Sequence, residues 1–207
     1  MRETLLSILV AAIAYLLGCF STGLTVSGAK GVDIRNRGSK NTGASNVLRV
    51  MGLKSGLITF AGDFLKAALA CWIGSLILPG TTFGIARYGM MLAGLFAIIG
   101  HNWPVFYGFK GGKGVACSAA VGFFVDPLWG SAALVACLAV IALTRFISLG
   151  SMTMLFCYMV LMCIAHWGQW AVCLFTVVLF AMCVWRHRSN IQRLLSGTEN
   201  RIGQKAK

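Results

Sequence analysis

The long uncharged runs of this chain restrict its folding options more than any other feature. The run from Leu5 to Val26 contains no Asp, Glu, Lys or Arg, and further apolar segments follow at short intervals. Of the 207 residues, 58% are hydrophobic and only 11% are charged, whereas soluble domains carry about 25% charged residues. Such a chain cannot cover a water-facing surface, so we expect an integral membrane protein.

Within a bilayer only helices and closed barrels satisfy every backbone hydrogen bond. The apolar runs are continuous and lack the period-two alternation of barrel strands. We therefore predict an all-α integral membrane protein with a single domain over residues 1–207. The predicted seven transmembrane helices are Leu5–Val26, Ser55–Leu78, Tyr88–Phe106, Gly114–Phe124, Leu128–Phe146, Ser151–His166 and Gln169–Trp185.

The fourth segment is short, with eleven residues, whereas a helix that crosses squarely needs about 20. The basic residues nevertheless favour a crossing there, because seven crossings put fifteen of the eighteen Lys and Arg on one side. Short loops rich in Lys and Arg remain cytoplasmic, so we expect a periplasmic N-terminus and a cytoplasmic C-terminus. The fifteen are Lys30, Arg35, Arg37, Lys40, Arg49, Lys54, Lys110, Lys113, Arg145, Arg186, Arg188, Arg193, Arg201, Lys205 and Lys207.

The stretch FKGGKG, residues 109–114, comes directly before this short segment. Irregular backbone at membrane depth is tolerated where it lines a protein or water cavity, so we predict a Gly-rich re-entrant loop. The following helix N-terminus offers N–H groups and partial positive charge to an anion, and the two lysines add charge. The alternative is a cytoplasmic anchor with a flexible turn. A Walker A loop is excluded because Gly114, not Ser or Thr, follows the second lysine.

The first loop is also polar and reads RNRGSKNTGASNVLRVMG over residues 35–52. Its hydroxyls, amides and glycines suit an oxyanion such as phosphate, although an ordinary Gly/Ser/Asn loop has a similar composition. We expect a short interfacial helix over Ala44–Met51, with Val47, Leu48 and Met51 facing lipid.

A few ionisable residues lie inside or beside the predicted spans. Asp63 and Lys66 are three apart on one helix face, and we expect them to pair with each other inside the bundle. His101, in GHNWP, is either a general base or a structural residue. Three scattered histidines and five acids predict no metal site. The net charge of +13 is explained first by orientation in the membrane and second by an anionic substrate, rather than by nucleic acid.

Four separated motifs together resemble one known family. GSKNTGASNVLR, GHNWPVFYGFKGGKGVA, RFISLGS and RHRSNIQRLLSGTE are similar to the bacterial acyl-phosphate:glycerol-3-phosphate acyltransferases, the PlsY family, in order along the whole chain. The resemblance implies transfer of an acyl chain from acyl phosphate to the 1-hydroxyl of glycerol 3-phosphate. It also implies a seven-helix fold in the bacterial inner membrane, a site facing the cytoplasm and no cofactor. We infer no obligate protein partner.

The resemblance assigns the site by position. Its catalytic residues fall on Ser39, His101 and Lys113. The substrate-binding residues that it implies are Asn41, Asn46, Arg49, Lys110, Gly111, Gly112, Gly114, Ser151, Arg188 and Asn190, with Ser148 as a neighbour. Two departures are visible: Ser45 stands where threonine is usual, and Cys117 where threonine is frequent.

The chemistry does not determine which group accepts the proton of the attacking hydroxyl. An acyl phosphate is an activated anhydride, so direct attack by the glycerol hydroxyl needs positioning and charge neutralisation more than a protein nucleophile. The proton acceptor is then His101 or, as the resemblance favours, a substrate phosphate oxygen. A covalent route through Ser39 is disfavoured because no base lies beside it in sequence. An anion transporter and a lipid-binding scaffold are the alternative functions. Two observations oppose the transporter. The polar motifs cluster on one face of the membrane, and the sequence shows no inverted repeat.

Overall fold

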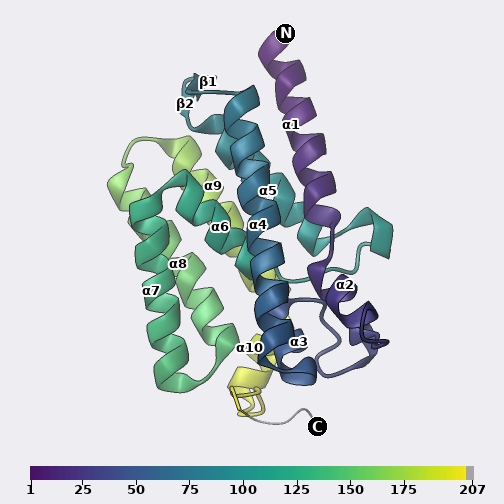
Figure 1. Cartoon of the computed structure of the whole chain (residues 1–207). Coiled ribbons are helices and arrows are strands. Elements are labelled where there is room, and N and C mark those ends of the chain that lie inside the picture. Colours follow the sequence, from purple (N-terminus) through teal and green to yellow (C-terminus); the bar gives the residue numbers. More distant parts are fainter. Residues whose placement is uncertain (204–207) are drawn as a thin grey trace. The chain divides into compact units, whose positions relative to one another are not determined.

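The computed structural model describes residues 1–203, so Lys205 and Lys207, counted above among the basic residues, lie outside the described residues. Figure 1 shows that the regular secondary structure of the described residues is helical apart from one small hairpin. The hairpin pairs strands β1 (Thr81–Thr82) and β2 (Ile85–Ala86) in antiparallel register. The chain forms two compact units, Met1–Val125 and residues 126–203, and each unit is described by itself.

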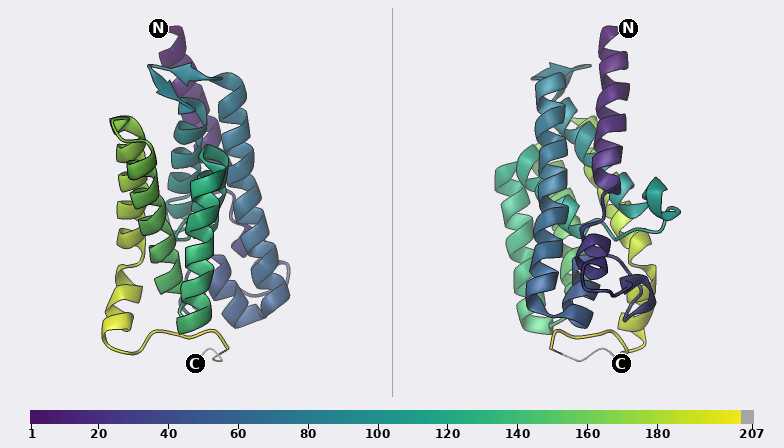
Figure 2. Two further views of the ribbon diagram at one scale, coloured as in Figure 1. Left: turned by 90° about the vertical axis from the view of Figure 1, so that its left-hand side faces the viewer. Right: turned by 45° about the vertical axis from the view of Figure 1, so that its right-hand side comes forward.

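The first unit contains the elements up to Val125. Its α-helices are α1 (Arg2–Cys19), α2 (Thr22–Gly28), α3 (Ala44–Met51), α4 (Leu53–Ile77), α5 (Tyr88–Asn102) and α6 (Val115–Val125), and its short 3-10 turns are η1 (Ile34–Asn36) and η2 (Val105–Tyr107). In Figures 1 and 2 the long helices α1, α4 and α5 run side by side.

Small residues allow α1 and α5 to approach closely. A Cβ on Gly18 would lie 2.2 Å from the carbonyl oxygen of Ala97, and a Cβ on Gly100 would lie 2.2 Å from that of Tyr15. Such close approach is typical of packing between membrane helices. The Tyr15 hydroxyl also donates a hydrogen bond to the Trp103 carbonyl, at 3.0 Å. The contact therefore fixes the end of α5, which precedes the glycine-rich loop.

The second unit contains α7 (Pro127–Thr144), α8 (Ile147–Ala165), α9 (Trp170–Arg186) and α10 (Arg188–Leu195). In Figure 1, α7 and α8 form an antiparallel pair. Asp126 caps α7 by accepting from the Trp129 N–H at 3.3 Å, and its other oxygen lies 3.1 Å from His166 Nε2 at the end of α8. The carboxylate thus joins the start of one helix to the end of the next.

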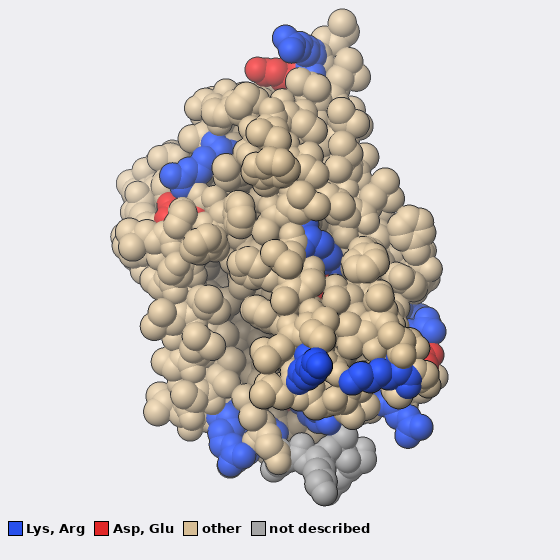
Figure 3. All heavy atoms as spheres, in the orientation of Figure 1, with Lys and Arg blue, Asp and Glu red and all other residues tan. Residues whose placement is uncertain are grey.

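Only some of the predicted transmembrane helices are long enough to cross a membrane. Among the described residues five stretches are long and apolar enough to cross: Arg2–Gly28, Leu53–Ile77, Tyr88–Tyr107, Pro127–Thr144 and Ile147–Ala165. The bent pair α9 and α10, which meet at 61°, raises the number to six if it counts as one span. Figure 3 shows that most of the visible surface carries no Lys, Arg, Asp or Glu. The chain is therefore a helical membrane protein.

The fourth predicted segment forms α6, an apolar helix of 11 residues. At 1.5 Å per residue it is too short to cross a hydrocarbon core of about 30 Å by itself. The helix starts one residue after Gly114, whose φ is +76°.

The predicted boundaries differ from the structure most in three places. The first segment breaks at Phe20, because Ser21 caps a separate helix by accepting from the Leu24 N–H. The third ends at Asn102, two residues before Pro104, as expected from the restriction that proline places on the preceding residue. The sixth begins at Ile147 rather than Ser151.

The interfacial helix is confirmed in its bounds but not in all of its predicted contacts. α3 covers Ala44–Met51, and Val47 is fully buried. The prediction that Val47 faces lipid is therefore wrong. The reason is that α3 packs against α4, where a Cβ on Gly56 would lie 2.6 Å from the Leu48 side chain.

Candidate active site

The first loop is held together by the amide of Asn46, which is 2% exposed. Its Oδ1 accepts from the Ser39 N–H at 2.8 Å. Its Nδ2 lies within hydrogen-bond distance of three backbone carbonyls, those of Asn41 at 2.9 Å, Arg37 at 3.0 Å and Ile34 at 3.4 Å. One buried amide thus shapes the backbone around Ser39, and its polar atoms are used inside the loop rather than on a ligand.

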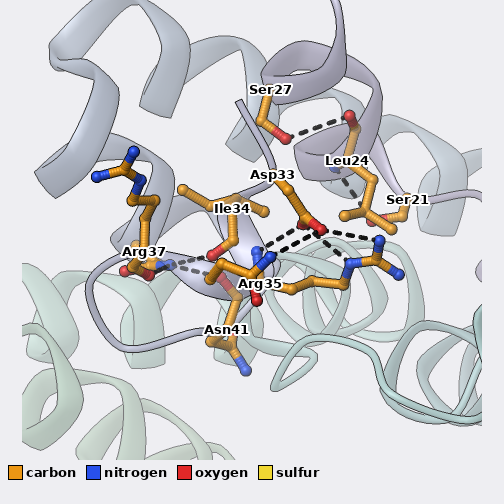
Figure 4. A network of polar contacts seen from close by, with 10 residues as sticks. Ser21, Leu24, Ser27, Asp33, Ile34, Arg35, Arg37 and Asn41 are labelled. Atoms are coloured by element: carbon orange, nitrogen blue, oxygen red, sulfur yellow. Dashed lines mark hydrogen bonds and ion pairs between the residues drawn. The ribbon is translucent and has the colours of Figure 1, made fainter. Parts of the chain in front are cut away.

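The start of the same loop is an Asx-type turn, drawn in Figure 4. The Asp33 carboxylate accepts from the Arg35 backbone N–H and from the Arg35 guanidinium, each at 3.0 Å. These hydrogen bonds from Arg35 lower the pKa of Asp33 and raise that of Arg35. Arg35 is therefore engaged in closing the turn.

Asn41 links the first loop to the glycine-rich loop. Its Oδ1 accepts from the Gly43 N–H at 2.9 Å, and its Nδ2 donates to the Gly111 carbonyl at 3.5 Å. Two polar segments that lie 70 positions apart in sequence therefore meet within the first unit. The exposed Ser39 and the half-buried Arg49 both belong to the first of these segments, and they precede and follow Asn41 in the sequence.

The glycine-rich loop folds back on the end of α5. The N–H of Gly111 donates to the Asn102 carbonyl at 3.3 Å, and the N–H of Gly112 donates to the His101 carbonyl at 3.0 Å. Gly111 and Gly112 were predicted to bind substrate, and their amides are bonded to α5 in this structure. The first N–H groups of α6 have no partner within their own helix. Lys113, half-buried, precedes that helix by two residues, whereas Lys110 is exposed.

His101 lies beneath this loop and is 8% exposed. A Cβ at position 112 would lie 2.0 Å from His101 Nε2, so the ring occupies the space of a side chain there. On the other side of the ring, Nδ1 lies 3.0 Å from Lys66 Nζ. Lys66 and Asp63 form the predicted buried ion pair, at 2.9 Å. The sequence predicted that pair, but not its contact with His101.

The remaining predicted residues belong to the second unit. The Ser151 hydroxyl donates to the Ile147 carbonyl of its own helix at 2.8 Å. The Arg188 guanidinium stacks 5.2 Å from the centre of the Trp185 ring. Asn190 is buried, and its Nδ2 donates to Glu199 Oε1 at 2.8 Å. Their predicted substrate contacts stay predictions.

Glu199 joins three side chains of the second unit, and the sequence did not lead us to predict this role. The carboxylate is 7% exposed and accepts from Asn190, from the Ser148 hydroxyl at 3.0 Å and from Arg193 Nε at 2.8 Å. A lone acid within a basic C-terminal segment was the available signal, because a buried charge requires partners.

Metal chemistry has no visible ligand set. Within residues 1–203, no group of three or more His, Cys, Asp or Glu side chains is arranged to hold a metal ion. The first unit offers Lys and Arg side chains and backbone amides to a substrate's charge.

Comparisons with known proteins agree on one family. The family model described as glycerol-3-phosphate acyltransferase matches residues 8–197. A curated protein of Thermoanaerobacter sp. (strain X514) with that name is 43% identical over 200 residues, which are 96% of this chain and 97% of the relative. One from Clostridioides difficile (strain 630) is 41% identical over 201 residues, 96% of each chain.

Two solved structures are similar in fold. Both are of PlsY, described as an integral membrane glycerol 3-phosphate acyltransferase. Its glycerol 3-phosphate form superposes with a TM-score of 0.86 at 37% identity and covers 95% of this chain and 96% of its own. Its lysophosphatidic acid form gives 0.83 at 36% identity, with 95% of each chain covered.

Proposed function

This chain belongs to the glycerol-3-phosphate acyltransferase family, and from that premise we propose that it acylates the 1-hydroxyl of glycerol 3-phosphate. The acyl donor is acyl phosphate, and the products are 1-acylglycerol 3-phosphate, or lysophosphatidate, and inorganic phosphate. The relatives' names and the substrate and product forms of the similar structure support the acceptor and the product. The donor is the one that the family resemblance of the four motifs implies.

The observation that carries the proposal is the meeting of the two polar loops at Asn41 and Gly111. Both substrates bear a phosphate, so the reaction needs two anion-binding elements close together. The first anion-binding element is the first loop, with Ser39 and Arg49. The second is the N-terminus of α6, with Lys113. Cationic side chains and helix N-termini are the groups that stabilise phosphate.

The reaction then proceeds by direct transfer. The 1-hydroxyl oxygen of glycerol 3-phosphate attacks the acyl carbonyl carbon, the carbon–oxygen bond to phosphate breaks, and inorganic phosphate leaves. Lys113 neutralises the charge that develops on the leaving group. A substrate phosphate oxygen takes the hydroxyl proton. Ser39 orients a phosphate or the hydroxyl and forms no covalent intermediate.

The topology forms part of the proposal. The chain works as one domain that crosses the inner membrane of a bacterium seven times, with the N-terminus in the periplasm. The short α6 crosses behind a re-entrant loop, and the active site opens to the cytoplasm. The distribution of Lys and Arg supports this orientation.

The test is an assay of purified protein in lipid with acyl phosphate and radiolabelled glycerol 3-phosphate. We expect labelled lysophosphatidate, and none when an acyl thioester replaces acyl phosphate. Activity with the thioester alone would disprove the donor. Uptake of labelled phosphate into protein-containing vesicles, without acylation, would favour the transporter instead.

A further inference from the structure

Lys66 has more partners than an ion pair requires. Its ammonium nitrogen lies 2.9 Å from Asp63 Oδ1, 2.5 Å from the Phe20 carbonyl oxygen and 3.0 Å from His101 Nδ1. An ammonium has three N–H groups and accepts nothing. The contacts with the Phe20 carbonyl and with His101 Nδ1 are hydrogen bonds, and the contact with Asp63 is an ion pair. One N–H of the ammonium is therefore donated to the imidazole.

This contact decides which nitrogen of His101 carries the hydrogen. A nitrogen that accepts from an ammonium has no hydrogen of its own, so in a neutral ring the hydrogen is on Nε2. Asp63 Oδ1 lies 3.6 Å from Nδ1, which is too far for the competing hydrogen bond that would place a hydrogen there. Lys66, held by Asp63, is thus the group that selects the tautomer.

The selected tautomer points an N–H at the glycine-rich loop. Nε2 is on the side of the ring that faces Gly112, and among the described residues the hydrogen bonds of the His101 side chain involve only Nδ1. We infer that Asp63 and Lys66 are positioning residues that hold His101 as a neutral Nε2–H donor to the phosphate at the glycine-rich loop. The inference rests on the proposed function and deepens it.

A donor at Nε2 cannot take the hydroxyl proton of the acceptor. His101 is therefore a substrate-binding donor in the acyl transfer, and the proton goes to a substrate phosphate oxygen. The small residue at position 112 follows from the same arrangement, because a side chain there would displace the N–H that faces the loop.

The first test reads the tautomer without any assay of activity. Protein labelled with ¹⁵N in histidine is studied by NMR in lipid, and the His101 signals are those that disappear in His101→Gln. We expect one protonated and one unprotonated nitrogen, with the hydrogen on Nε2. A hydrogen on Nδ1, or a doubly protonated ring, would overturn the inference even if the enzyme transfers acyl chains.

The second test separates a donor from a base. The amide nitrogen of glutamine reaches the position of Nε2 and that of asparagine the position of Nδ1, and neither amide is a useful base. We expect His101→Gln to keep kcat within about threefold, and His101→Asn and His101→Ala to lose about tenfold or more. Equal loss in all three variants would support a base and contradict the inference.

Lys66 is tested through the double variant Asp63→Asn with Lys66→Met, which leaves no unpaired buried charge. We expect the His101 tautomer to become mixed and the KM for glycerol 3-phosphate to rise about tenfold or more. Lys54→Met, at an exposed position of the same helix, is the matched control and keeps both the spectrum and the KM. An unchanged His101 spectrum in the double variant would show that Lys66 has no role in tautomer selection.

Discussion

Gly112 has no room for a side chain, because a Cβ at this position would lie 2.0 Å from Nε2 of His101. The groups around Gly112 cannot easily move to make room for a Cβ. The imidazole is buried and contacts Lys66 Nζ, and the Gly112 N–H donates to the His101 carbonyl. The glycine-rich loop is therefore fitted to the end of α5 by direct contact, and its sequence reflects that contact as well as any bound phosphate.

We expect Gly112→Ala to impair both stability and activity. Forcing a methyl group into this contact displaces the ring or the loop, at a cost of about 1–3 kcal/mol. Thermal unfolding in detergent and kcat/KM for glycerol 3-phosphate are the measurements. Gly28→Ala is the control, since a Cβ there meets nothing within 4 Å. Equal behaviour of the two variants would show that the contact is unimportant.

Asn46→Ala should loosen the first loop. The variant removes the acceptor of the Ser39 N–H and the donor to three carbonyls, and we expect a loss of roughly 2–4 kcal/mol of stability. The KM for glycerol 3-phosphate should rise as well. The exposed Asn36, which donates to Asp33 at 3.3 Å, gives the comparison: Asn36→Ala should alter little. A stable Asn46→Ala protein with raised KM would instead identify Asn46 as a substrate ligand.

The helices over the apolar runs, and one contact of the site, follow from local patterns. Long apolar runs predict membrane helices because the bilayer leaves the backbone no other solution, and the three-residue spacing of Asp63 and Lys66 predicts their pairing. The contact of Lys66 with His101 joins α4 to α5, and a single sequence does not reveal which residues of two helices face each other. Val47 was misplaced for the same reason, since the partner of α3 is α4 rather than lipid.

Lys113→Ala should nearly abolish activity while the protein still inserts into the membrane. The loss of one charge-assisted contact to phosphate costs about 1.5–3 kcal/mol and hence more than tenfold in rate. Lys110→Ala should cost less, because Lys110 is exposed. Turnover is compared at equal amounts of membrane-inserted protein, with Lys54→Ala as the control. Near-normal turnover in Lys113→Ala would remove Lys113 from the proposed anion site.

The proposed orientation predicts which positions an impermeant thiol reagent reaches in intact cells. In a chain depleted of its own cysteines, Cys at position 40 should be protected, and Cys at 81 or 169 should be modified. All three positions are exposed on the protein, so burial does not explain a difference. Modification at 40 before lysis would invert the topology.

The direct mechanism predicts that no acyl-enzyme forms. A covalent route needs an activated hydroxyl or thiol. Among the described residues, the hydrogen bonds of Ser39 and Cys117 join neither side chain to a histidine or a carboxylate. The Asn46 side chain accepts from the backbone N–H of Ser39 rather than acting as a base for its hydroxyl. Cys117 is fully buried, and its thiol donates to the Asp63 carbonyl at 3.2 Å.

The measurement is the intact mass of enzyme mixed with acyl phosphate in the absence of acceptor and then denatured. We expect unmodified protein, impaired activity in Ser39→Ala and retained activity in Cys117→Ala. A stoichiometric adduct that passes its acyl chain to added glycerol 3-phosphate at the rate of turnover would disprove direct attack. In that case the adduct's position would identify the nucleophile, and Lys113 would still be required, because phosphate leaves in the first step of either route.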